Sequence, residues 1–231
     1  MILLNYIQEG SEAVASGEPV EKTLSIIELI GSGGTAGIII IGILFLLMIV
    51  AIYIYFERLF AIKAATKVDA NFMNQIKDHV SQGKIDSAQI LCAQVNSPVS
   101  RLINKGITRI GKPLEDINTA IETAGRLEVY GLEKNVSVLA TISSVAPMIG
   151  FLGTVIGMIL SIFEIANSGG QIDIKQLSDG LYTAMTTTVG GLIVGIIAYM
   201  AYNHLVVRTD KVIYKMEANS LEFLDHLNEP V

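Results

Sequence analysis

The sequence predicts an all-α integral membrane protein with three transmembrane helices. Its residues are 51% hydrophobic, and its mean hydropathy of +0.54 is higher than a typical soluble protein shows. Three stretches contain no Asp, Glu, Lys or Arg: residues 35–56, 135–163 and 181–203. About 20 apolar residues are enough for a helix to cross the hydrocarbon layer of a bilayer. Because backbone polar groups must be satisfied internally there, each stretch is expected to be helical.

The first span, residues 35–56, is a dense run of aliphatic residues. It ends in Tyr55 and Phe56, directly before Glu57 and Arg58, and such an aromatic and charged boundary is typical of a membrane interface. The segment before the span is acidic and has no basic n-region, so we expect no cleavable signal peptide. The N-terminal segment is therefore expected to remain in the protein.

The distribution of basic residues predicts the orientation in the membrane. Residues 57–134 carry eleven of the 16 Lys and Arg, residues 204–231 carry three, and residues 1–34 and 164–180 carry one each. Positive charge marks the cytoplasmic side. The predicted segments are a periplasmic N-terminal segment (1–34), a first span (35–56), a cytoplasmic helical region (57–134), a second span (135–166), a periplasmic loop (167–179), a third span (180–203) and a cytoplasmic C-terminal helix (204–231).

The segments outside the spans also have helical patterns. Residues 23–30 are amphipathic and precede the glycine-rich residues 31–34, which predicts an interfacial helix and a hinge; a disordered tail with an apolar patch is the alternative. Apolar residues from Pro113 onward continue into the second span without a strong break, so one long helix is expected there. The third span is likewise expected to continue into the C-terminal helix.

One face of the second span consists of small or polar residues. At alternating steps of four and three they are Ser143, Pro147, Gly150, Thr154, Gly157 and Ser161. Close helix packing explains such a stripe, and the pair Gly153 and Gly157 fits the small-xxx-small pattern. A polar lumen is the other explanation, because a hydroxyl at membrane depth, such as that of Thr154, needs its own backbone, a neighbouring chain or water as a partner. Pro147 is expected to kink the helix.

The third span repeats this character and favours the polar lumen. It contains Thr183, Thr186, Thr187 and Thr188, followed by glycines that include Gly191 and Gly195. No Asp, Glu, His or Lys lies in the middle of any predicted span. A proton pump needs a group that binds and releases protons within the membrane field, so a partner would have to supply it. We predict that Ser143, Ser161, Thr183 and Thr187 line the lumen, and that Pro147, Gly150, Gly153, Gly157, Gly191 and Gly195 pack helices together.

Two motifs resemble the MotA/TolQ/ExbB proton-channel family. They are APMIGFLGTVIGM at residues 146–158, preceded by AGRL at 124–127, and GLYTAMTTTVGGL at residues 180–192. The resemblance extends roughly from Thr35 to the C-terminus. Three spans and an outside N-terminus resemble ExbB and TolQ more than four-span MotA.

The resemblance implies a ring, a pentamer of such chains around a dimer of a single-span ExbD- or TolR-like partner. In that arrangement an Asp of the partner carries protons past pore threonines, which by motif are Thr154 and Thr188. Many ExbB proteins have a Glu where this sequence has Thr183, so the effect of that replacement stays open. A TonB-like protein and membrane lipid are further implied partners.

The function implied is that of an inner-membrane proton-channel or stator subunit that uses the proton motive force to energise TonB-dependent outer-membrane transport. A TolQ-like envelope-integrity motor, or a gliding or secretion motor, is the alternative; a small-solute transporter and a non-conducting scaffold are less well supported. The single Cys92 excludes an intrachain disulfide, and the charge of −6 disfavours nucleic-acid binding. We expect no enzymatic activity, no cofactor and no metal site.

Overall fold

The computed structural model describes residues 34–66, 71–167 and 174–228, and these residues are almost entirely helical with no strand among them. The interfacial helix expected at 23–30, most of the hinge and the centre of the loop expected at 167–179 lie outside the described residues. The all-α prediction is confirmed for the part that is described.

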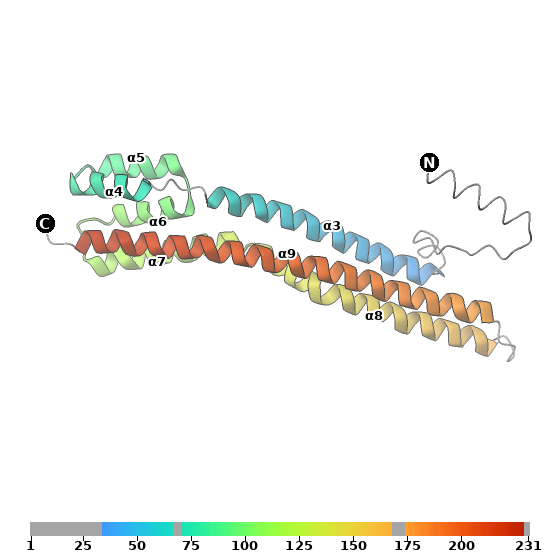
Figure 1. Ribbon diagram of the computed structural model, residues 1–231. Coiled ribbons are helices and arrows are strands. Elements are labelled where there is room, and N and C mark those ends of the chain that lie inside the picture. The colour runs from blue at the N-terminus through green and yellow to red at the C-terminus, as the bar shows by residue number, and fades with distance from the viewer. Residues whose placement is uncertain (1–33, 67–70, 168–173, 229–231) are drawn as a thin grey trace, which may run out of the picture. The chain divides into compact units, whose positions relative to one another are not determined.

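Three of the helices are long and apolar enough to cross a membrane. They are α3 (Gly34–Ala65), α8 (Val136–Asn167) and α9 (Ile174–Asn228) (Figure 1). Helices α3 and α9 contain the first and third predicted spans, and α8 contains the second except for residue 135. The protein is therefore a multi-pass membrane protein. Helix α9 has 55 residues, so at about 1.5 Å per residue it is much longer than a bilayer is thick. The third span and the C-terminal segment thus form one helix.

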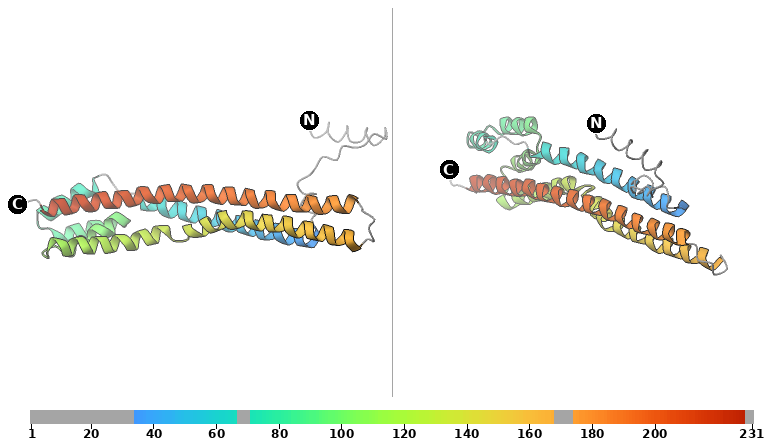
Figure 2. Two further views of the ribbon diagram at one scale, coloured as in Figure 1. Left: turned by 90° about the horizontal axis from the view of Figure 1, so that it is seen from below. Right: turned by 45° about the vertical axis from the view of Figure 1, so that its right-hand side comes forward.

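Four shorter helices lie between the first and second spans. They are α4 (Phe72–Ser81), α5 (Ile85–Val95), α6 (Pro98–Ile107) and α7 (Leu114–Glu133), and each packs against the next (Figures 1 and 2). The C-terminal part of α9 completes their core, because Phe223 is fully buried against Gly106 and Ile121. Other buried members of this core are Phe72, Ile76, Ala88, Cys92, Ile103 and Ile107.

The expected continuous helix from Pro113 into the second span is wrong. Helix α7 ends at Glu133 and α8 begins at Val136, and between them Asn135 has a φ of 63°, in the left-handed region. Asparagine tolerates this conformation better than most residues, which lets the chain turn there. Apolar periodicity continues across the turn and therefore hides it.

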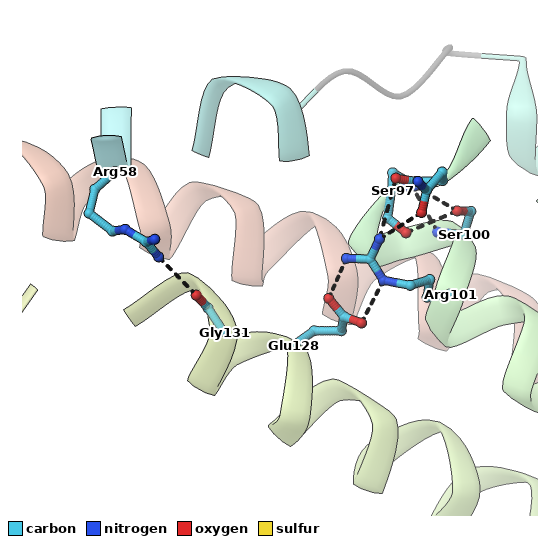
Figure 3. A network of polar contacts seen from close by, with 7 residues as sticks. Arg58, Ser97, Ser100, Arg101, Glu128 and Gly131 are labelled. Atoms are coloured by element: carbon cyan, nitrogen blue, oxygen red, sulfur yellow. Dashed lines mark hydrogen bonds and ion pairs between the residues drawn. The ribbon is translucent and has the colours of Figure 1, made fainter. Parts of the chain in front are cut away.

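Helix α6 has a well-defined start that also fixes it to α7. The Ser97 and Ser100 side chains each accept from the other residue's backbone N–H, at 3.0 and 2.8 Å, which forms a capping box. In the next turn Arg101 makes two bonds to the Glu128 carboxylate on α7, at 2.6 and 2.5 Å (Figure 3). The two hydrogen bonds to the Glu128 carboxylate raise the pKa of Arg101 above its usual value.

A buried arginine connects α3 to the end of α7. Arg58 is 8% exposed, and its Nη1 donates to the Gly131 carbonyl at 3.2 Å (Figure 3). Its Nη2 pairs with Glu57. The Gly131 carbonyl is one of the last four backbone carbonyls of α7, and these carbonyls have no hydrogen-bond partner within the helix. A cation there also stabilises the helix dipole. Arg58 thus holds α3 beside the turn between α7 and α8.

The chain divides into two compact units. The first contains the start of α3, the end of α8 and the start of α9, within residues 1–41 and 152–187. The second contains everything else, within residues 42–151 and 188–231.

Candidate functional site

Three hydroxyl residues of the first unit are buried between its own helices. The exposed fractions are 5% for Ser161, 8% for Thr183 and 0% for Thr187. Each lies against a glycine on a neighbouring helix segment: Ser161 against Gly180, Thr183 against Gly37 and Thr187 against Gly153. A Cβ on any of these three glycines would overlap the hydroxyl residue opposite it.

Two of these hydroxyls are satisfied by their own helix. Ser161 Oγ donates to the Gly157 carbonyl at 2.9 Å, and Thr187 Oγ1 donates to the Ala184 carbonyl at 2.8 Å. In this arrangement Ser161, Thr183 and Thr187 pack against the glycines opposite them, and their role in lining a pore stays a prediction.

The glycines of the first unit allow α8 and α9 to approach closely. A Cβ placed on Gly157 would lie 3.0 Å from Ala184 Cβ and 3.2 Å from the Gly180 carbonyl oxygen. A Cβ on Gly153 would overlap the Thr187 side chain. Both glycines are thus in helix contacts, as the small-residue pattern predicts. Thr154, by contrast, keeps an intermediate exposure.

In the second unit α8 and α9 meet backbone to backbone. A Cβ on Gly191 would lie 2.6 Å from the Ala146 carbonyl oxygen and 2.9 Å from Gly150 Cα. A Cβ on Gly195 would lie 2.6 Å from Pro147 Cγ. No larger residue fits between these helices, so these glycines and Pro147 are packing residues. Helix α8 continues through Pro147.

Thr188 bridges the two helices of this contact. It is partly exposed, and its Oγ1 donates to the Gly150 carbonyl on α8 at 3.2 Å. Ser143 is also partly exposed, but its Oγ donates to the Ala140 carbonyl of its own helix at 2.7 Å. Of the hydroxyl residues predicted to line a lumen, Thr154, Thr188 and Ser143 are therefore those that another chain can reach.

A polar cluster on α3 and α9 is not predicted by the sequence patterns. Tyr55 Oη lies 2.8 Å from His204 Nδ1, and Arg208 Nε donates to His204 Nε2 at 2.9 Å. Arginine has no acceptor, so Nδ1 carries the hydrogen and donates to Tyr55. The signal available in the sequence was the position of Tyr55 and His204 at the ends of two apolar runs. Among the described residues no group of three His, Cys, Asp or Glu is placed to hold a metal.

Known proteins support the resemblance seen in the motifs. The profile described as "MotA/TolQ/ExbB proton channel family" matches residues 94–218. A Haemophilus influenzae Tol-Pal system protein TolQ is 31% identical over 194 residues, and the match covers 76% of this chain and 80% of the TolQ chain. An ExbB homologue of Methanothermobacter thermautotrophicus is 26% identical over 197 residues, and the match covers 84% of this chain and 67% of the homologue. A biopolymer transport protein ExbB of Aquifex aeolicus is 38% identical over 87 residues, and the match covers 38% of this chain and 58% of the Aquifex protein. The chain belongs to the MotA/TolQ/ExbB proton channel family.

Proposed function

We propose that this chain is the channel subunit of a proton-driven motor in the inner membrane, assembled as a ring, with a pentamer expected, around a single-span ExbD- or TolR-like partner. The observation that carries the proposal is the exposure pattern of the hydroxyl residues. Thr154 and Thr188, which the family motif selects, are partly exposed, whereas Ser161, Thr183 and Thr187 are packed inside the chain. A partner helix could reach the first pair and not the second group.

The proton carrier is assigned to the partner. The predicted spans hold no acidic, His or Lys residue in their middle, so this chain supplies hydroxyls rather than a titrating group. Protons moving down the gradient would protonate the partner's Asp in turn and rotate the inner partner against the ring. A proton crossing the membrane releases about 2.3 kcal/mol per 100 mV, so several protons could drive a substantial stroke.

The basic residues support an N-terminus in the periplasm and a C-terminus in the cytoplasm, since residues 57–134 and 204–231 carry fourteen of the 16. Single cysteines at residue 170 and residue 228 test this orientation in intact cells. An impermeant thiol reagent should label residue 170 and not residue 228. The reverse pattern would overturn the orientation.

We propose energising of TonB-dependent transport as the task, with a TolQ-like role as the alternative. The relatives named ExbB favour the first role, and the TolQ relative favours the second because it matches 76% of this chain. Affinity purification of the tagged protein from native membranes, followed by mass spectrometry, separates them. An ExbD-like protein together with a TonB-like protein supports the first role, and a TolR-like protein supports the second. Recovery of this chain alone, without proton conduction in liposomes, would leave a non-conducting scaffold.

A further inference from the structure

An apolar groove of about 470 Å³ lies between α3 and α9 within the second unit. Its lining includes Ala51, which is only 2% exposed. Four larger apolar side chains of the groove are exposed: Ile52, Phe56, Ile197 and Met200. Tyr55 and His204 are the lining residues with polar side chains. Apart from these two side chains, the groove offers an apolar surface on two helices that span the membrane.

The groove ends where the apolar spans end. The charge-free stretch of α3 ends at Phe56 and that of α9 ends at Asn203. The last groove residues along the two helices are Phe56 and His204. The groove therefore lies at the depth of the hydrocarbon layer, and its end lies at the level of lipid headgroups, where tyrosines such as Tyr55 are common.

A positively charged side chain is held at this end of the groove. Arg208 Nε donates to His204 Nε2 at 2.9 Å, and His204 Nδ1 donates to Tyr55 Oη at 2.8 Å. These two bonds orient the guanidinium beside the groove. Both Nη groups of Arg208 are without a hydrogen-bond partner or carboxylate among the described residues. The planar guanidinium thus presents donors of the kind that bind a phosphate.

The surface around Arg208 has a surplus of positive charge. Residues 204–216 of α9 contain one acidic residue, Asp210, and three basic residues: Arg208, Lys211 and Lys215. On α3, Glu57 is already paired with Arg58. A phosphodiester with no charge of its own to balance it would be attracted here, whereas an ammonium group would be repelled.

We propose that the α3–α9 groove binds one anionic phospholipid of the phosphatidylglycerol class. An acyl chain lies along the groove, and the phosphate binds Arg208 and Lys211, which are three residues apart on one side of α9. The charge surplus favours this headgroup over phosphatidylethanolamine, whose ammonium would face the same cations. The proposal requires that α3 and α9 span the membrane and does not depend on proton flux through the protein.

Native mass spectrometry of the full-length chain, purified in detergent and stripped of lipid, tests the proposal. The probes are phosphatidylglycerol, phosphatidylethanolamine with the same acyl chains, and soluble glycerophosphoglycerol. Phosphatidylglycerol should bind about fivefold more tightly than phosphatidylethanolamine, which is the factor that one basic residue commonly contributes toward anionic lipid. Equal binding of the two lipids would overturn the anionic headgroup. Glycerophosphoglycerol binding as tightly as phosphatidylglycerol would show that the groove holds no acyl chain, which would also overturn the proposal.

Variants locate the binding to this groove. Arg208→Gln should weaken phosphatidylglycerol binding about fivefold and reduce the preference for it. Ala201→Phe fills the groove, so it should weaken binding of both lipids and leave the preference unchanged. Arg109→Gln is the matched control, since Arg109 is exposed after the end of α6 and does not line the groove. Unchanged binding in Arg208→Gln, or an equal loss in Arg109→Gln, would contradict the assignment.

The assembled complex separates a lipid from a second copy of this chain, which could also cover the groove. The complex purified from native membranes in mild detergent should retain about one phosphatidylglycerol per chain, and the complex of Arg208→Gln should retain less. A complex that retains none, formed by a chain that binds the lipid when isolated, would assign the groove to a neighbouring chain and overturn the proposal. Proton flux is measured separately, so this failure would leave the proposed motor function standing.

Discussion

The Thr188 hydroxyl on α9 donates to the Gly150 carbonyl on α8 at 3.2 Å, so a residue that the family motif places at the pore also joins two helices of its own chain. This is long for a hydroxyl bond and therefore weak. Thr188→Val keeps the shape and removes the bond, and should lower the free energy of unfolding by only about 0.5–1 kcal/mol. We nevertheless expect it to abolish proton flux in the complete complex.

Thr188→Ser is the matched control, because it retains the hydroxyl and should retain flux. Thermal unfolding in detergent and proton uptake in liposomes measure the two effects separately. Full flux in Thr188→Val would remove Thr188 from the pathway.

Gly191 and Gly190 are neighbours with different surroundings. A Cβ on Gly191 would lie 2.6 Å from the Ala146 carbonyl oxygen, whereas a Cβ on Gly190 has Leu44 Cδ1, at 3.6 Å, as its nearest neighbour. Gly191→Ala should therefore push α8 and α9 apart and cost about 1–3 kcal/mol. Gly190→Ala should stay within about 0.5 kcal/mol of the native protein. Thermal unfolding compares the pair, and equal effects would show that the close contact does not matter for stability.

Two arginines test how much a charged contact contributes when it is buried. Arg58 is buried and supports both Glu57 and the Gly131 carbonyl. Arg58→Met would leave both groups without this partner and should cost about 2 kcal/mol or more. Arg126 pairs with Glu122 on one face of α7, with side chains 79% and 58% exposed, so Arg126→Met should cost less than about 0.5 kcal/mol. A similar loss of unfolding free energy in both variants, measured by thermal unfolding, would contradict the role given to Arg58.

Burial raises the pKa of the Cys92 thiol to about 12. Because the thiolate is the reactive form, the folded protein should react very slowly with maleimide at pH 8, and the denatured protein quickly. The same pKa shift determines whether stability rises or falls with pH. Between pH 9, the ordinary thiol pKa, and pH 12, the unfolded chain loses the Cys92 proton while the folded chain keeps it, so stability should fall as pH rises. Cys92→Val should lessen that fall; rapid labelling of the folded protein would show that the thiol is accessible.

The three spans could be predicted because lipid imposes a simple requirement. A helix must be long and free of charge to cross the bilayer, and sequence records both properties. The turn at Asn135 could not be predicted in this way. Residues on both sides of it continue the apolar pattern, and only a single asparagine marks the left-handed conformation.

The roles of the candidate site residues are harder to predict from the sequence, for a different physical reason. Small and hydroxyl residues serve both helix packing and a polar lumen, so the stripe on α8 and the threonines of α9 do not say which face is packed. The packing of Thr187 against Gly153, and of Thr183 against Gly37, depends on how helices meet in space. The motif match selected Thr154 and Thr188, which are partly exposed, while composition alone had grouped Thr183 and Thr187 with the lumen.

The most direct measurement is proton flux into liposomes that contain this chain alone, the chain with its co-purified single-span partner, or the chain with a partner whose intramembrane Asp is changed to Asn. We expect flux only in the complete complex with the native partner, since this chain carries no titrating group in the middle of its spans. Flux from this chain alone, or undiminished flux with the Asn partner, would show that the proton carrier does not lie in the partner.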